Sequence, residues 1–137
     1  MSFEGSTLVD WNAYAVTRRE LGPGFVRILG YFREDGIKSV AAIEEAMRAN
    51  NAAAMVIPAH TLKGEARQFG AEPLGALAEK IETIARDAVE QHDGCEHALV
   101  DVAKLRALFE QTLQLLEREA TPIVTARKPM GGFGRKI

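Results

Sequence analysis

The sequence of 137 residues contains a single cysteine, Cys95, and no apolar run long enough to cross a bilayer. One cysteine excludes an internal disulfide framework and is typical of a reducing compartment. A membrane-spanning helix would need about 20 mostly apolar residues in a row. The N-terminal stretch MSFEGSTLVDW lacks the basic and then apolar segments of a secretory signal. Together these absences predict a cytoplasmic protein.

Aromatic residues are also few, at 7% of the chain, and the strict apolar–polar alternation of strands is nearly absent. The chain has instead 47% hydrophobic and 26% charged residues, which is ordinary for a soluble globular protein. Apolar residues recur with the 3.6-residue period of amphipathic helices. A chain of this length is best interpreted as one domain with one core.

The pattern predicts a short helix over about 8–19 and four long ones over about 25–47, 52–69, 73–88 and 97–119. The connections between the long helices are short, so neighbouring helices should run antiparallel. We therefore expect an all-α protein, an antiparallel four-helix bundle with a short additional N-terminal helix.

Two positions leave the course of these helices open. Gly36 lies on the apolar face of the second helix, where a missing side chain would allow another helix to approach closely; alternatively, Asp35–Gly36 breaks the helix there. Pro58 lies two residues before His60 and removes a backbone donor. The third helix should either kink at Pro58 or begin near it.

Charge divides the chain into two parts. Residues 120–137 carry four basic residues and no acid, whereas the net charge of the whole chain is −2. We expect a bundle domain over 1–119 and a basic, disordered tail over 120–137. The acidic body argues against nucleic acid as a partner, because phosphate binding needs a basic face.

The stretch IPAHTLKGEARQFGA, residues 57–71, places polar residues around one of only three histidines. At 100° per residue, Gly64 and Arg67 fall within about 40° of His60, Lys63 within about 60° and Gln68 within about 80°. The apolar residues of the same helix, Met55, Leu62, Ala66 and Phe69, cluster on the opposite side. His60 is therefore predicted at the centre of an exposed face.

These residue types suit phosphoryl chemistry. A neutral imidazole has one nitrogen lone pair free to attack an electrophile. Lys63, one turn from His60, would stabilise phosphoryl oxygens, and Arg67 and Gln68 would support binding. Gly64 would give steric clearance beside the ring, so that a bulky partner could come close.

The sequence here resembles the histidine phosphotransfer (HPt) domain family. The resemblance rests on AHTLKG at 59–64 and FGAEPLGALAEKIE at 69–82. The residues that fit the family pattern are Ala59, His60, Leu62, Lys63, Gly64, Gly70, Ala71, Leu74, Leu77, Ile81 and Glu82.

The resemblance implies a phosphoryl carrier in a two-component His–Asp phosphorelay. His60 would be phosphorylated on Nε2, with Lys63 assisting. The partners would be a response-regulator receiver domain, a hybrid histidine kinase, or both. The receiver would supply Mg²⁺, so this chain itself needs no cofactor or metal. A monomer is expected, because one complete bundle closes its own core, and no membrane partner is expected.

Two other functions are compatible with parts of the sequence. A helical module could bind a receiver or kinase without relaying, although such a module has no need for both His60 and Lys63. A metal-dependent hydrolase could be built on His92, Cys95 and His97, but their spacing matches no paired ligand motif. We interpret that loop as exposed and polar. No phosphate-cradling glycine loop occurs, so the chain should not phosphorylate itself from ATP.

Overall fold

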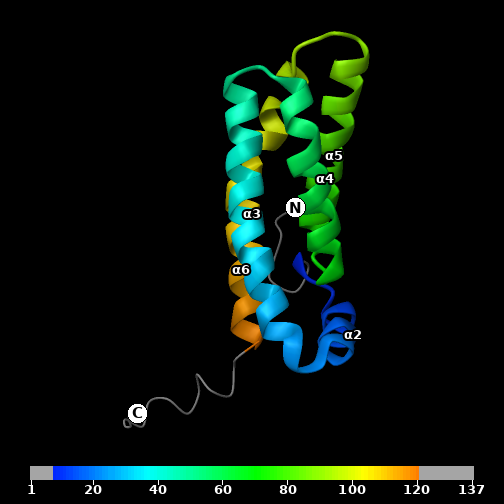
Figure 1. Ribbon diagram of the computed structural model, residues 1–137, viewed down its shortest axis with the longest axis vertical. Helices are drawn as coiled ribbons and strands as arrows, with labels where there is room; N and C mark the ends of the chain where they lie inside the picture. Colours follow the sequence, from blue (N-terminus) through cyan, green and yellow to red (C-terminus); the bar gives the residue numbers. More distant parts are fainter. Residues whose placement is uncertain (1–7, 121–137) are drawn as a thin grey trace, which may run out of the picture.

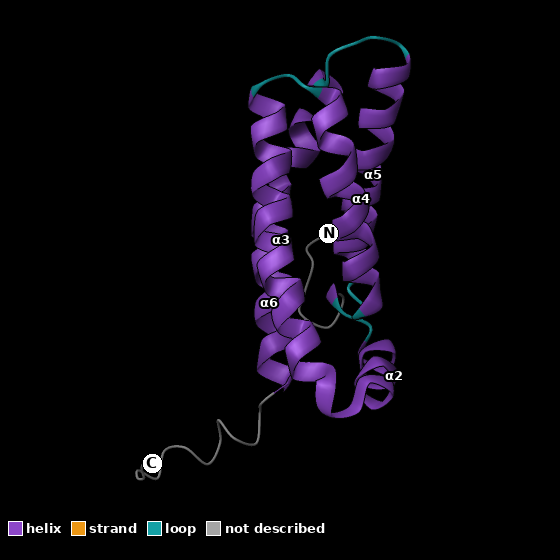
Figure 2. Ribbon diagram, in the orientation of Figure 1, coloured by secondary structure: helices purple, strands orange, loops and turns teal. Residues whose placement is uncertain are grey.

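The computed structural model of the protein describes residues 8–120. Its helices are α2 (Trp11–Leu21), α3 (Phe25–Arg48), α4 (Ala52–Gln68), α5 (Glu72–Glu90) and α6 (Leu99–Ala120). The last four run antiparallel beside one another, and α2 lies at the lower end of the bundle (Figure 1). Over these residues there is no strand, only helices joined by short loops (Figure 2). The predicted all-α four-helix bundle is confirmed.

The helix ends follow from local capping. Asp10 begins α2 by accepting hydrogen bonds from the backbone of Asn12 and Ala13, at 3.0 and 3.2 Å. The helix predicted over about 8–19 is therefore observed as α2, which begins at Trp11 and ends at Leu21. Asn51 caps α4 in the same way, accepting from Ala54 N at 3.1 Å. Gly70, with φ of +79°, ends the turn that follows α4.

Gly36 lies within an unbroken α3, so the alternative of a helix break at this position is wrong. A Cβ atom built on Gly36 would overlap the ring of Phe109 in α6. The glycine therefore lets the two helices come close, which is the reason the sequence suggested for it. Ion pairs on either side of this contact, Arg33–Glu117 at 3.1 Å and Arg106–Glu44 at 2.6 Å, also join α3 to α6.

Pro58 lies inside α4, six residues after its first residue. The helix does not begin at the proline, so that interpretation of Pro58 is wrong. The proline has no N–H to donate to the carbonyl of Ala54. It lies on the partly exposed side of the helix, beside the wholly buried Ala59.

Aromatic rings pack against one another in the core, beginning at Tyr14 of α2. Tyr14, Phe25, Phe69, Phe32 and Phe109 form a chain of ring contacts with centroids 5.3–5.8 Å apart. Tyr14 also donates a hydrogen bond to the Leu116 carbonyl at 2.9 Å, which attaches α2 to α6. Buried aromatic pairs of this kind contribute about 0.5–1.5 kcal/mol beyond their area.

The helices α4 and α5 share the most extensive contact of the bundle. Both helices carry alanines that are wholly buried, namely Ala59, Ala66, Ala78 and Ala85. Small side chains let two helix axes approach closely, which brings one helix's polar residues within reach of the other's. This close pairing positions the site described below.

None of the helices in the described part of the chain is long and apolar enough to cross a membrane. The predicted basic tail lies outside the described residues, except for Ala120, which is the last residue of α6.

Replacing Gly36 with alanine should destabilise the fold, because the new methyl group meets the Phe109 ring. Overpacking of this kind costs about 1–3 kcal/mol, partly offset by about 1 kcal/mol of helix propensity. Gly30→Ala is the matched control, since nothing lies within 4 Å of a Cβ at Gly30. Urea unfolding should show a lower free energy of unfolding for Gly36→Ala and an unchanged or higher one for Gly30→Ala. Equal stability of the two variants would contradict the close approach of α3 and α6.

Candidate functional site

His60 lies in the middle of α4, and 57% of its side chain is exposed. Met55, Leu62 and Ala66 on the same helix are wholly buried. The helix thus buries one side and presents His60 on the other, as the sequence predicts.

The imidazole of His60 contacts Glu82, a residue of α5. The Glu82 side chain is only 6% exposed, and its Oε2 atom lies 2.9 Å from His60 Nδ1. Arg86, one turn further along α5, donates to the same oxygen from Nε at 2.9 Å and from Nη2 at 2.8 Å. Lys63 Nζ lies 2.9 Å from the other oxygen, Oε1, and forms an ion pair with it. One buried carboxylate therefore holds three basic side chains.

The charge state of Glu82 follows from these contacts. Burial raises the pKa of the carboxyl group, but the interactions with Lys63, Arg86 and His60 together outweigh burial and lower the pKa from 4.5 to about 2. Glu82 is therefore a carboxylate at neutral pH.

An ionised carboxylate can only accept hydrogen bonds, so His60 Nδ1 must carry the proton that lies between them. In the neutral ring, the other nitrogen, Nε2, then holds the free lone pair. With more than half of the side chain exposed, that lone pair is accessible from solvent. The geometry thus selects one tautomer and one reactive nitrogen.

Lys63 and Gly64 lie where the sequence places them, on the face of His60. Lys63 is already paired with Glu82, and 22% of its side chain is exposed beside the ring. A Cβ atom on Gly64 would meet nothing within 4 Å. The fold itself therefore does not need a glycine at this position.

Arg67 and Gln68, predicted to support binding, make contacts of their own within the bundle. Arg67 reaches across to α5 and pairs with Glu72 at 3.0 Å and Glu79 at 2.9 Å. Its stem occupies the space left by Gly75. Gln68 is the last residue of α4, and its carbonyl accepts a hydrogen bond from Thr17 at 2.7 Å. The structure thus brings Lys63 to His60, but it directs the Arg67 guanidinium to two carboxylates on α5.

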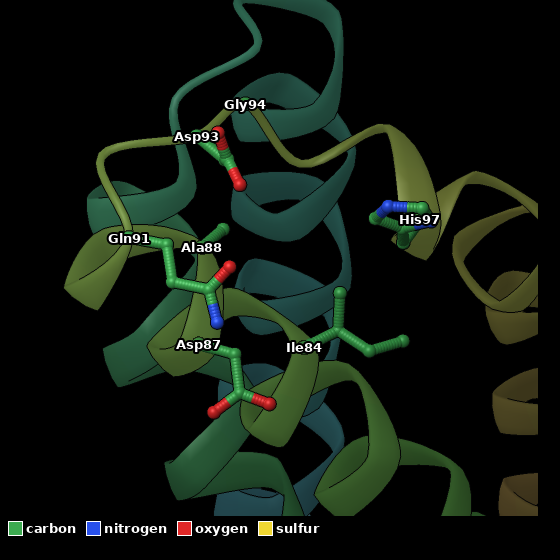
Figure 3. Close-up of a pocket in the computed structure, with 7 residues that line it drawn as sticks. All are labelled: Ile84, Asp87, Ala88, Gln91, Asp93, Gly94 and His97. Carbon is green, nitrogen blue, oxygen red and sulfur yellow. The ribbon is translucent and has the colours of Figure 1, made fainter.

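The loop between α5 and α6 does not bring three candidate metal ligands together. Among residues 8–120, no three His, Cys, Asp or Glu side chains lie close enough together to hold a metal ion. Figure 3 shows a small pocket at this end of the bundle, of about 270 Å³, with the ring of His97 set well apart from Asp87 and Asp93.

Cys95, predicted to lie in an exposed loop, is instead wholly buried. Its backbone N–H donates to Asn50 Oδ1 at 2.8 Å, and its Sγ lies 3.4 Å from the same atom. Asn50 thereby joins the α3–α4 turn to this loop. Burial raises the pKa of the Cys95 thiol, which disfavours the thiolate that a nucleophile or metal ligand would need.

The fold and this cluster define a class: an α-helical bundle that presents one oriented imidazole to solvent. Comparison with known proteins identifies the family within this class. The model of the family described as Hpt domain matches residues 27–120. The chain therefore belongs to the Hpt domain family, the histidine phosphotransfer proteins of His–Asp phosphorelays, whose members are phosphoryl carriers and not typical enzymes.

A solved structure shares the fold. The histidine-containing phosphotransfer protein B (HptB) from Pseudomonas aeruginosa PAO1 matches with a TM-score of 0.74 at 20% sequence identity, over 83% of this chain and 95% of that chain. No match was found among curated proteins.

The contacts of Glu82 and Arg86 in this cluster were not predicted from the sequence. Glu82 fits the family pattern, but its contact with His60 spans 22 residues and depends on how α4 and α5 pack. A signal was present: Glu82 directly follows the buried Ile81, so a charged residue borders the apolar stripe of α5. Arg86 follows one turn later, at a spacing that favours an ion pair.

Glu82→Gln should lower the free energy of unfolding at pH 7 by about 1.5–3 kcal/mol, the range for hydrogen bonds to charged groups. The pKa of Glu82 is lower in the folded protein, so its stabilising effect is complete above about pH 4.5 and is lost as pH falls through about 2. Urea unfolding at pH 7 and about 2.5 should therefore show the difference from wild type shrinking with acid. Glu79→Gln, at a carboxylate with half of its side chain exposed, is the control and should change little. A difference of the same size at both pH values would contradict the lowered pKa.

Proposed function

We propose that this protein relays a phosphoryl group through His60 to or from the aspartate of a receiver domain. The observation that carries the proposal is the contact of the buried Glu82 carboxylate with Nδ1 of an imidazole that is otherwise exposed. This contact leaves Nε2 as the nucleophile and fixes the direction in which its lone pair points. Each group lies on a rigid helix, His60 on α4 and Glu82 on α5, which reduces the entropy lost when the partner docks.

The transfer step follows from this arrangement. The Nε2 lone pair forms a bond to phosphorus while the P–O bond to the partner's aspartate breaks, and the aspartate oxygen keeps that electron pair. The proton on Nδ1 stays in place, so the phosphorylated ring carries a positive charge. Glu82, already ionised, stabilises this charge without reorganising. Transfer to a second aspartate is the same step in reverse.

The two cations beside Glu82 are suited to the incoming phosphoryl oxygens. A phosphoryl group brings a charge of about −1.5 to −2 at neutral pH. Lys63 and Arg86 together balance more charge than Glu82 supplies, and their side chains are 22% and 56% exposed. Both can therefore shift towards a group bound on His60. In this proposal Arg67 and Gln68 lie further along α4 and contact the partner only at its edge.

The remaining catalytic groups belong to the partner in this proposal. The receiver domain supplies Mg²⁺ and the acidic residues that bind it, and this chain contributes neither a nucleotide site nor a cofactor. We further propose that the protein acts as a monomer in the cytoplasm, with a receiver domain, a hybrid histidine kinase, or both in turn as its partners.

The test uses three variants, one for each histidine of the chain. A receiver domain carrying a labelled phosphoryl group is incubated with the wild type and with His60→Gln, His92→Gln and His97→Gln. His92 and His97 are also exposed, so they control for histidine exposure alone. The wild type and both control variants should take up an acid-labile, base-stable label, and His60→Gln should take up none.

Label on His60→Gln would show that another residue is the acceptor. Binding of the receiver without transfer to the wild type would instead favour the non-relaying module.

Gly64→Ala tests whether the glycine is required for stability or for docking of the partner. The added methyl group lies in open space, so the variant should be as stable as the wild type or up to about 1 kcal/mol more stable. The same methyl group lies on the face that the receiver covers, so phosphoryl transfer should slow by about tenfold, or about 1.4 kcal/mol in the barrier. Thermal unfolding and transfer kinetics measure the two effects. Transfer at the wild-type rate would show that Gly64 gives no clearance.

A further inference from the structure

A groove lies on the surface between α5 and α6, on the side of α5 that faces away from the His60 cluster. Its volume is about 850 Å³. Its apolar walls are formed by Pro73, Ala76 and Leu77 of α5 and by Ala107 and Leu108 of α6. At 100° per residue, Ala76 and Leu77 fall about 120–140° from Glu82 around α5. A group bound in this groove therefore leaves the face of His60 free.

The groove also contains a buried charge. Asp101, in the first turn of α6, is only 4% exposed, and its Oδ1 atom lies 3.4 Å from Nζ of Lys80. Hydrogen bonds between a cation and a carboxylate are usually shorter, at about 2.7–2.9 Å, so this carboxylate can accept a closer cation. Lys80 and Lys104 are exposed at the rim and can turn towards solvent. The groove thus fits an occupant with apolar side chains and a basic group.

The segment that follows α6 has this composition. Residues 121–137 lie outside the described part of the chain, and their sequence is TPIVTARKPMGGFGRKI. The segment carries four basic residues and no acid, and its largest apolar residues are Met130 and Phe133. Segments that remain in solvent contain few aromatic and β-branched residues. The apolar residues of this one favour a surface that buries them.

We infer that Met130 and Phe133 bind in the α5–α6 groove of the same molecule, and that Arg135 pairs with Asp101. The inference goes beyond the proposed function, because neither His60 nor the transfer of a phosphoryl group takes part in it. The bound segment covers the apolar walls of the groove and holds its basic residues away from the face of His60.

The distances along the chain allow this contact. Ala120 ends α6 at the lower end of the bundle (Figure 1). Measured back along α6 from Ala120, Gln111 at one end of the groove is about 14 Å away and Asp101 about 28 Å. An extended chain covers about 3.3 Å per residue. After a reversal over four residues, Met130 and Phe133 therefore reach at most about 20 and 30 Å, which spans the groove.

The covalent connection makes a weak contact sufficient. A short linker gives the linked group an effective concentration in the millimolar range. A contact with a Kd of about 1 mM is then formed in about half of the molecules. A separate partner at micromolar concentration must bind about a thousandfold more tightly to reach the same occupancy. The chain's own segment is therefore the occupant that the groove favours.

The experiment places a nitroxide label on the segment and records the amide NMR signals of the full chain. The label is attached through Lys136→Cys. Cys95 is wholly buried, and burial raises the pKa of its thiol, so it stays unlabelled. The signals of Leu77 and Lys104 in the groove should be broadened far more than that of Ile37, an exposed residue of α3.

Variants on both sides of the contact test it further. Phe133→Ser should lower the ratio of docked to undocked molecules about tenfold, so most of the broadening should disappear. Ala76→Lys places a like charge in the groove and should have the same effect. Ala103→Lys, the matched control at an exposed residue of α6 outside the groove, should keep the original broadening. Thermal unfolding of each variant confirms that the fold is retained.

The contrary outcomes are distinct. Equal broadening of Leu77 and Ile37, or broadening that persists in Phe133→Ser, would overturn the inference. Arg135→Gln should weaken the contact by a smaller factor than Phe133→Ser, and an unchanged ratio would overturn the pairing with Asp101. A mixture of nitroxide-labelled chains with separate isotope-labelled chains tests for a second copy as the occupant. Groove broadening as strong in this mixture as within one chain would overturn the contact with the chain's own segment.

Discussion

The buried carboxylate of Glu82 is the contact on which the rest of the site depends. It holds Nδ1 of His60 at 2.9 Å and also binds Lys63 and Arg86. Burying a carboxylate is costly unless opposite charges and donors surround it. Here they do, because Lys63, Arg86 and His60 lower the pKa of the Glu82 carboxyl group although burial raises it. A flexible surface histidine thereby becomes an oriented nucleophile with a fixed counter-charge.

The packing of the bundle keeps Glu82 next to His60. The two residues lie on different helices, so their contact depends on how closely α4 and α5 approach. Wholly buried alanines on both helices permit that approach. Gly36 does the same for α3 and α6 at the ring of Phe109. Small residues at helix contacts thus position a reactive group that lies outside the core.

Much of the fold and of the site is predictable from the sequence. The rest is not predictable, and the reason is physical. Helical periodicity predicts the bundle, the exposed face of His60 and the neighbouring Lys63, because all three depend on positions within a single helix. The contact with Glu82, the pairing of Arg67 with Glu79 and the burial of Cys95 depend instead on how separate elements pack. Periodicity gives the direction in which a residue faces, but it does not specify the partner that the residue meets.

The central claim is that Glu82 fixes the tautomer of His60, and ring nitrogen NMR tests it most directly. Long-range proton–nitrogen correlation of the imidazole at about pH 8.5 distinguishes a protonated from an unprotonated nitrogen in a neutral histidine. The structure predicts that Nδ1 of His60 is protonated and Nε2 is not, whereas the exposed His92 serves as an internal reference for an imidazole without this contact. A His60 spectrum with the proton mainly on Nε2 would contradict the account.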